Sequence, residues 1–556
     1  MLSRLVSALL LCAAASPLPA QEAMDPLLEQ RRIDALTART SALGGFQPQG
    51  GVPDPGPAQA AEGPCFQVNR LTVEGATLLT RTELDALTAP FAPKCMQGAD
   101  IQGAMRAIDA AYANKGYITT KTYIPPQNLG SGTLTLKVVE GHVEGIYLID
   151  GNGQIEGARA RRLLGTAFPL QKGRLFNLRD FEQGLDQMNR LTSVDATLRL
   201  QPGQMTGGSD ILVQRMQEDR FRGALRFDTL GSRMNGRNRL ALDLGLDDLL
   251  GMNDTWVLNL SSTRNTNALS LYGSVPWRYW TFEIEFGHSE YLTPLSPLSE
   301  LFGSTRSAVI TARYMLARGQ YSTTEASFAL NQRHSQRFIN DSRLTPQRLA
   351  SLDLGVSHIR LGQSARNSVD ATVSFGLDAL GADRDPAGLG RDDPRAQYVL
   401  ISGGWQRQAG LRDMGTLVTD LRLQLSHQAL YGSEQLALGS YATVRGYDEP
   451  VAAGDRGAYL RTDLYLSPDF WTQIVPEQIR AEVTTRMQPL LFLDVGFAHD
   501  VASSRTTRAA GIGVGVSWQF DRVTASGLVG LPLIDSRNRV HSDDPVMQIR
   551  FDVKTW

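Results

Sequence analysis

The sequence predicts an N-terminal helix, two small α/β modules and a C-terminal antiparallel β-barrel that spans a membrane. Three observations support this fold class: an apolar targeting segment at the start, one order of helices and strands that occurs twice, and period-two alternation over the last 340 or so residues. No stretch after the N-terminus approaches eighteen consecutive apolar residues, so a membrane-spanning helix is not expected. The formal net charge of −2 over 556 residues gives no excess of positive charge that would attract nucleic acid.

Residues 1–20 have the pattern of a signal peptide. Arg4 supplies the positive start, and Leu5–Ala15 is an apolar run that is too short to span a membrane. Cleavage after Ala15 and cleavage after Ala20 both fit the small residues there. Processing as a lipoprotein at Cys12 is disfavoured, because a bulky leucine precedes that cysteine. The pattern indicates an exported protein.

Residues 21–43 predict a helix, from Met24 to Leu43. Asp25 can cap it and Pro26 suits the first helical position. Arginines interrupt its apolar face, so it lacks the wide stripe of a core helix and would tolerate a water-filled lumen. A surface helix or a disordered arm fits the sequence equally well. Residues 44–64, rich in Pro and Gly, predict a linker.

Residues 65–141 predict the first α/β module. A strand, two helices and two further strands follow one another, and the second helix has apolar residues at helical spacing. The predicted elements are a strand at 66–74, helices at 82–87 and around Ile101, Met105, Ile108 and Tyr112, and strands at 117–123 and 133–139.

The same order returns in residues 142–217, which predict the second module. Asn177 can cap its second helix, where apolar residues again fall on one face. The predicted elements are strands at 143–149, 194–200 and 211–213, a helix at 158–164, and a helix carrying Leu178, Phe181, Leu185 and Met188. Two modules with one element order form an architectural repeat.

Cys65 and Cys95 are the two cysteines that remain after removal of the signal peptide. An even number in an exported chain predicts a disulfide, and two free thiols are the alternative. The chain has no C-x-x-C pattern that would indicate redox catalysis.

Residues 218–556 predict the barrel. Apolar and polar residues alternate in roughly sixteen segments, which indicates strands with one apolar face. A soluble sandwich or propeller is the alternative. Long loops such as Asp383–Arg395 and Gly432–Gly457 alternate with short turns, and this asymmetry is typical of an outer-membrane barrel. A closed barrel also satisfies its backbone groups without helices.

The stretch Leu490–Phe497 places Asp494 on one face with Phe492 and Gly496, opposite an apolar face. A carboxylate is costly against lipid, so Asp494 is expected to face the lumen. Gly496 leaves room for another backbone. Arg445 lies on the longest loop, and an inward fold of that loop would let it pair bidentately with Asp494. The alternative is that Arg445 is a solvated loop residue and that Asp494 is an ordinary aspartate of the lumen.

Several motifs resemble those of known translocators. Residues 444–447, Val-Arg-Gly-Tyr, resemble the V-R-G-[YF] motif of the BamA-like superfamily, and residues 492–496 resemble its F-x-D-x-G strand motif. The two modules resemble polypeptide-transport-associated (POTRA) domains, with the most similar segments at 116–134 and 177–191. The chain is therefore similar, over nearly its whole mature length, to the two-partner secretion transporters of the TpsB (ShlB/FhaC/HecB) family.

The resemblance implies an outer-membrane translocator with periplasmic POTRA domains that secretes a large exoprotein of the TpsA type, without nucleotide hydrolysis or a cofactor. It implies sixteen strands in contact with outer-membrane lipid, a helix that plugs the pore, and a chain that works as a monomer. The residues it assigns to a gating latch are Arg445, Gly446, Tyr447, Phe492, Asp494 and Gly496. A barrel-assembly factor, which usually carries three or more POTRA domains, and a solute porin are the alternatives. The chain lacks the H-E-x-x-H and G-x-S-x-G motifs that would favour an enzyme.

One feature departs from the family pattern. Barrel proteins often end in an aromatic residue, and Trp556 supplies it, but the outward residues Met547, Ile549, Phe551 and Val553 have the opposite parity. A bulge near Lys554 would reconcile the two.

Overall fold

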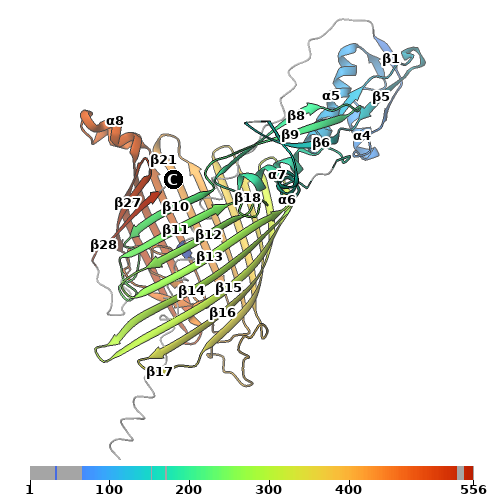
Figure 1. The fold of residues 1–556 in the computed structure, drawn as a ribbon. Helices are drawn as coiled ribbons and strands as arrows, with labels where there is room; N and C mark the ends of the chain where they lie inside the picture. The colour runs from blue at the N-terminus through green and yellow to red at the C-terminus, as the bar shows by residue number, and fades with distance from the viewer. Residues whose placement is uncertain (1–31, 34–64, 152, 170–171, 535–543, 555–556) are drawn as a thin grey trace, which may run out of the picture.

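The computed structural model describes residues 32–33, 65–151, 153–169, 172–534 and 544–554. Both α/β modules lie at one end of a large barrel (Figure 1). The predicted signal peptide, the linker, Trp556 and all but two residues of the N-terminal helix lie outside the described residues. The two that are described, Arg32 and Ile33, are helical, and Arg32 Nη2 donates to Gln435 O at 3.3 Å. Gln435 belongs to a loop inside the barrel.

The first module packs its helices on a three-stranded sheet of order β2-β5-β4, in which β2 and β5 run parallel. Its core includes Ile108, Tyr112, Leu134 and Leu136. Its elements are β1 (Phe66–Val68), β2 (Arg70–Glu74), α4 (Arg81–Thr88), β3 (Lys94–Met96), α5 (Gly98–Asn114), β4 (Lys121–Tyr123), η1 (Leu129–Ser131) and β5 (Thr133–Val139).

Two predictions for the first module were wrong in detail. The strand expected at 66–74 is two strands in different sheets, because β1 pairs with β3 while β2 pairs with β5. The strand expected at 117–123 is confined to its last three residues, since the chain turns at 117–120, where the amides of Tyr117 and Thr120 bond to Tyr112 O and Tyr117 O. A disulfide joins Cys65, which precedes β1, to Cys95 in β3.

The second module is a four-stranded sheet of order β7-β6-β9-β8 with two helices on it. The Asn177 side chain accepts a hydrogen bond from the Arg179 amide, which caps α7 as the sequence predicts. Phe181, Leu185 and Met188 of α7 are buried in the core. The elements are β6 (His142–Asp150), β7 (Gly153–Ile155), α6 (Ala158–Ala167), α7 (Leu178–Asn189), β8 (Val194–Pro202) and β9 (Gly208–Gln217).

Sixteen strands in the described residues form a closed antiparallel barrel, which confirms the predicted number. The barrel closes where β10 pairs with β28, and the two-residue β17 extends the hairpin of β16 and β18. The sixteen are β10 (Phe221–Asp228), β11 (Arg239–Asp247), β12 (Thr255–Ser262), β13 (Thr266–Trp277), β14 (Trp280–Ser296), β15 (Ser299–Arg318), β16 (Ser322–Ile339), β18 (Gln347–Leu361), β19 (Ala365–Gly376), β20 (Val399–Gly410), β21 (Gly415–Leu425), β24 (Arg456–Leu466), β25 (Met487–Asp500), β26 (Arg505–Phe520), β27 (Val523–Pro532) and β28 (Val546–Lys554).

Side-chain exposure along the strands follows the predicted alternation. On β25, Leu491, Leu493, Val495 and Phe497 are between 41 % and 47 % exposed, whereas Phe492 and Asp494 are buried. Apolar residues thus face outward, toward lipid, and polar residues face the lumen. At the C-terminus, β28 pairs with β27 in unbroken register up to Val553, so the described strand contains no bulge.

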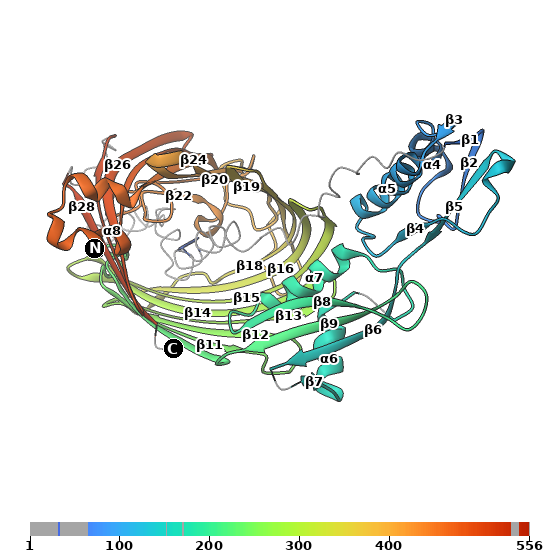
Figure 2. The same ribbon diagram turned by 90° about the horizontal axis from the view of Figure 1, so that it is seen from above.

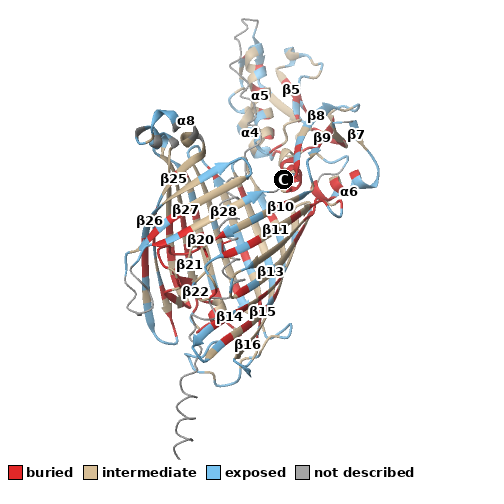
Figure 3. Cartoon of the chain, turned by 60° about the vertical axis from the view of Figure 1, so that its left-hand side comes forward, coloured by how far each residue is buried: buried red, intermediate tan, exposed pale blue. Residues whose placement is uncertain are grey.

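The connection between β21 and β24 enters the barrel. It includes η3 (Gly432–Glu434) and a hairpin of β22 (Leu436–Leu438) and β23 (Ala452–Gly454), and β22 appears inside the ring of strands in Figure 2. Buried residues are frequent around β22 and in the second module (Figure 3). We refer to residues 439–451, which join β22 to β23, as the inward loop.

The connection between β24 and β25 is longer than the short turns expected on its side. It contains η4 (Pro468–Gln473) and α8 (Glu477–Arg486), and α8 lies at the same end of the barrel as the modules (Figure 1). The Arg486 guanidinium lies 4.5 Å from the Phe520 ring. Among the described helices, none is both long and apolar enough to cross a membrane.

Candidate functional site

The inward loop places Arg445 against Asp494 on β25. Arg445 Nε donates to Asp494 Oδ2 at 2.7 Å, and Arg445 Nη2 donates to Asp494 Oδ1 at 2.8 Å. The Arg445 backbone amide adds a third hydrogen bond to Oδ2, at 3.0 Å. Both side chains are at most 2 % exposed. The pair is therefore bidentate, desolvated and fixed through both the side chain and the backbone of the loop.

Two further groups on the barrel wall contact the Arg445 guanidinium. Arg445 Nη2 lies 2.5 Å from Asp463 Oδ1 on β24, and the guanidinium carbon lies 4.0 Å from the Phe492 ring centroid. Phe492 is one residue of the predicted site, and its ring forms a cation–π contact. Asp463 was missed by sequence reasoning, although its place on the polar face of a strand was a usable signal. One arginine thus bridges two neighbouring strands.

Glycines allow the inward loop to approach the wall. Gly446 has φ of +98°, a conformation that side chains rarely adopt. A Cβ at Gly511 would lie 1.8 Å from Arg445 O, and a Cβ at Gly530 would lie 2.9 Å from the Gly446 Cα. The backbone approach therefore occurs over β26 and β27. The expectation that Gly496 would admit it was wrong, because the residues nearest Gly496 are its neighbours on β24 and the Leu438 side chain of β22.

Tyr447 anchors the end of the Val-Arg-Gly-Tyr motif at residues 444–447. Its hydroxyl oxygen lies 2.9 Å from both Ala510 O and Ile534 O, and it accepts a hydrogen bond from the Ala510 amide at 3.1 Å. Its ring packs in a buried cluster with Val444 of the loop and Ala498 of the wall. The loop is thus held at Arg445 by an ion pair and at Tyr447 by hydrogen bonds and packing.

Replacing Gly446 with Ala is expected to loosen the inward loop. The new Cβ would lie 2.8 Å from Leu531 O at a positive φ, a strain of about 1–3 kcal/mol. We expect Gly446→Ala to raise the proteolysis of the loop in the purified barrel. Gly527→Ala is the matched control, since a Cβ on this β27 glycine would meet nothing within 4 Å. Equal protease resistance in both variants would contradict the close approach.

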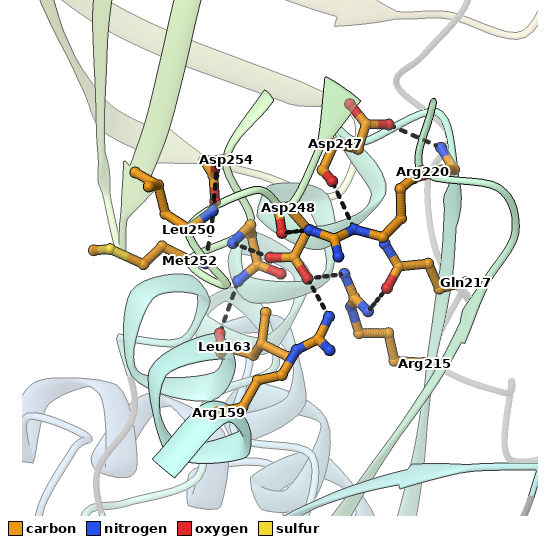
Figure 4. A network of polar contacts seen from close by, with 12 residues as sticks. Arg159, Leu163, Arg215, Gln217, Arg220, Asp247, Asp248, Leu250, Met252 and Asp254 are labelled. Atoms are coloured by element: carbon orange, nitrogen blue, oxygen red, sulfur yellow. Dashed lines mark hydrogen bonds and ion pairs between the residues drawn. The ribbon is translucent and has the colours of Figure 1, made fainter. Parts of the chain in front are cut away.

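A second polar cluster joins the second module to the barrel (Figure 4). Asp248, in the turn between β11 and β12, is fully buried and pairs with Arg159 of α6 at 2.9 Å and with Arg215 of β9 at 3.3 Å. Asp248 Oδ1 also accepts from the Asn253 amide at 3.1 Å. The Asn253 side chain in turn donates to Leu163 O at 2.8 Å. Burial lowers the pKa of Arg215, and the Asp248 carboxylate partly offsets that effect.

Helix α7 meets the next two barrel turns. Gln187 Nε2 donates to Arg278 O at 3.1 Å, and Arg318 lies 2.7 Å from Asp186 Oδ2. Burial raises the pKa of Asp186, and Arg318 partly offsets it. The Tyr279 hydroxyl donates to Asp180. Three successive turns therefore contact α6 and α7, and these contacts dock the second module on the barrel rim.

These features define a class of protein: a transmembrane barrel that holds an inward loop and carries two α/β modules at one mouth. Three family models match the chain. "Haemolysin secretion/activation protein ShlB/FhaC/HecB" covers residues 207–518, "POTRA domain, ShlB-type" covers 66–141, and "POTRA domain" covers 142–202. The chain therefore belongs to the ShlB/FhaC/HecB family of secretion proteins. It is an outer-membrane transporter of the two-partner secretion kind, and its POTRA domains lie in the periplasm.

Named relatives and a solved structure support this family membership. The chain is 31 % identical to the outer membrane transporter CdiB of Dickeya dadantii over 73 % of each chain, and 27 % identical to the hemolysin transporter protein ShlB of Serratia marcescens over 94 % of this chain and 90 % of that one. Among solved structures, CdiB from Escherichia coli matches with a TM-score of 0.84 and 25 % identity over 97 % of this chain and all of that one.

Proposed function

We propose that this transporter captures one large exoprotein in the periplasm and secretes it, unfolded, through the barrel. The observation that carries the proposal is the docking of the second POTRA domain on the rim of a barrel whose lumen holds a loop through a buried ion pair. A chain captured at the POTRA domains is thereby held at the pore mouth. Folding of the exoprotein outside the cell, rather than hydrolysis of a nucleotide, biases the movement.

Two edge strands are candidates for binding an extended segment of the exoprotein. Strand β4 ends the sheet of the first POTRA domain, and strand β8 ends that of the second. Tyr123 and Ile124 at β4 and Leu200 on β8 are exposed apolar residues beside those edges. An added strand would gain backbone hydrogen bonds from the edge and side-chain contacts from these residues.

The inward loop acts as a latch in this proposal. Arg445, Gly446, Tyr447, Phe492, Asp494 and Asp463 hold the loop in one arrangement inside the pore, and Gly496 accepts the packing of β22. The N-terminal helix, of which Arg32 contacts the backbone of Gln435, would plug the same lumen. The site uses paired charges and packing to fix a backbone, which supports a transport role rather than catalysis. Cargo passes one chain at a time, so a monomer suffices.

Deletion of residues 65–217 tests the proposal. In cells that also produce the exoprotein partner, we expect the truncated barrel to insert but the exoprotein to stay in the periplasm. The measurement is an immunoblot of medium, periplasm and outer membrane. The matched control follows the amounts of other outer-membrane barrels. A loss of those barrels with unchanged secretion would favour an assembly factor and contradict the proposal.

A further inference from the structure

Arg461, a neighbour of the latch on β24, has no role in the arrangement just described. It faces the lumen and is 3 % exposed. Its Nε and Nη1 atoms have no hydrogen-bond partner in the described part of the chain. Buried arginines usually pair with a carboxylate, since an uncompensated charge in a dry site is costly. The carboxylates on the neighbouring strands are therefore the candidates for compensating its charge.

Carboxylates flank Arg461 on both sides of its strand. In the antiparallel register it lies directly opposite Asp420 on β21 and directly opposite Asp494 on β25. Side chains at such positions have Cβ atoms about 4.5–5.5 Å apart, well within the reach of an arginine. Asp420 Oδ2 is itself buried without a hydrogen-bond partner in the described residues. Arg461 nevertheless forms no ion pair with either aspartate in the described structure.

The inward loop holds Arg461 away from these carboxylates. The Arg461 guanidinium is turned toward the ring of Tyr441, at 5.9 Å from its centroid. Arg445, on the same loop, occupies both oxygens of Asp494. Tyr441 and Arg445 are four residues apart, so withdrawal of the loop removes the contact of Arg461 and the partner of Asp494 together. A cavity of about 390 Å³ lined by Tyr441, Arg445, Arg461 and Asp420 gives the side chain room to turn.

We infer that Arg461 is a reserve counter-ion, which turns from Tyr441 to Asp494 when the inward loop withdraws. The exchange keeps the lumen carboxylate compensated in both positions of the loop. It lowers the electrostatic cost of releasing a desolvated ion pair, which otherwise opposes opening of the pore. Arg461 is thus a positioning residue that sets the balance between two loop arrangements. The inference rests on the proposed latch.

A double-mutant cycle tests the exchange. The readout is the midpoint temperature at which the purified barrel in detergent loses its compact, heat-modifiable form on a gel. Arg461→Ala is expected to lower the midpoint slightly in the wild-type background, where Arg445 compensates Asp494. In the Arg445→Ala background it is expected to lower the midpoint at least twice as much, since Arg461 is then the remaining counter-ion.

Two rescue variants separate charge from packing. Adding Asp494→Asn to the Arg445→Ala, Arg461→Ala double variant is expected to reverse most of the decrease in the midpoint temperature, because it removes the uncompensated carboxylate. Arg461→Lys in the Arg445→Ala background is expected to behave like Arg461 itself. Arg313→Ala, which breaks a lumen pair with Glu283 on other strands, is the matched control and should act equally in both backgrounds. If Arg461→Ala fails to insert, Arg461→Gln replaces it in the cycle.

The outcomes distinguish the exchange from the latch. An equal effect of Arg461→Ala in both backgrounds, or no rescue by Asp494→Asn, overturns the exchange and leaves the latch standing. Wild-type secretion and a wild-type midpoint in Arg445→Ala overturn the latch, and the exchange falls with it.

Discussion

Arg445→Ala and Asp494→Ala are each expected to abolish secretion of the exoprotein while the barrel still inserts into the outer membrane. Either change leaves a charge in a site that is at most 2 % exposed; Asp494→Ala removes all three hydrogen bonds, and Arg445→Ala removes the two that the guanidinium donates to Asp494. Breaking one side of such a buried pair costs about 3 kcal/mol, the lower end of the usual range, because Asp463 remains near Arg445 and Arg461 near Asp494. The barrel itself is held by sixteen hydrogen-bonded strands and should survive that loss.

The measurement is the amount of exoprotein in the medium, with the folded barrel in the membrane counted by its heat-modifiable gel band. Arg445→Lys keeps the charge but loses the planar fork that reaches both oxygens of Asp494, so partial secretion is expected. Arg313→Ala removes a lumen arginine outside the site and should secrete normally. Wild-type secretion by both alanine variants would rule out the latch.

Asp248→Ala is expected to undock the second POTRA domain from the barrel and to reduce secretion at least tenfold. The change leaves Arg159 and the buried Arg215 without the carboxylate that joins them to the β11–β12 turn. The loss of a buried charge partner costs about 3–5 kcal/mol at this contact, and swinging outward lets the buried Arg215 reach water. A captured segment would then no longer be held at the pore mouth.

Trypsin cleavage at Arg220 measures the undocking. Arg220 Nε donates to Asp247 O at 3.0 Å in the docked structure. Release of the domain is expected to break this contact and to expose the peptide bond after Arg220 to trypsin. Asp195→Ala, on the exposed edge strand β8 of the same domain, is the matched control and should keep the wild-type cleavage rate. Trypsin resistance of Asp248→Ala equal to wild type would show that the other α6 and α7 contacts suffice for docking.

Local patterns determined much of this protein. Period-two alternation is a property of each strand by itself, so it predicted the number of strands and the lumen-facing side of Asp494 without any knowledge of strand neighbours. The capping side chain of Asn177 acts two residues along the chain and was equally readable. Strand parity placed Asp494 in the lumen as a candidate partner of Arg445, and the resemblance of the VRGY and FxDxG motifs strengthened that pairing, which no local pattern could establish because 49 residues separate the two.

Tertiary structure alone decided which groups meet across strands. The chain cannot show locally that β1 and β2 separate into different sheets, since their partners lie 26 to 63 residues away. The pairing of Asp463 with Arg445 depends on the register of the barrel strands. The close approach of the loop backbone to Gly511 and Gly530 depends on where the loop folds back. The docking of Asp248 depends on the tertiary structure as well, and so does the lack of hydrogen-bond partners for Arg461 Nε and Nη1 within the described residues. Alternation fixes the face of a residue, but ion pairs form at distances of 3–4 Å that only the closed barrel establishes.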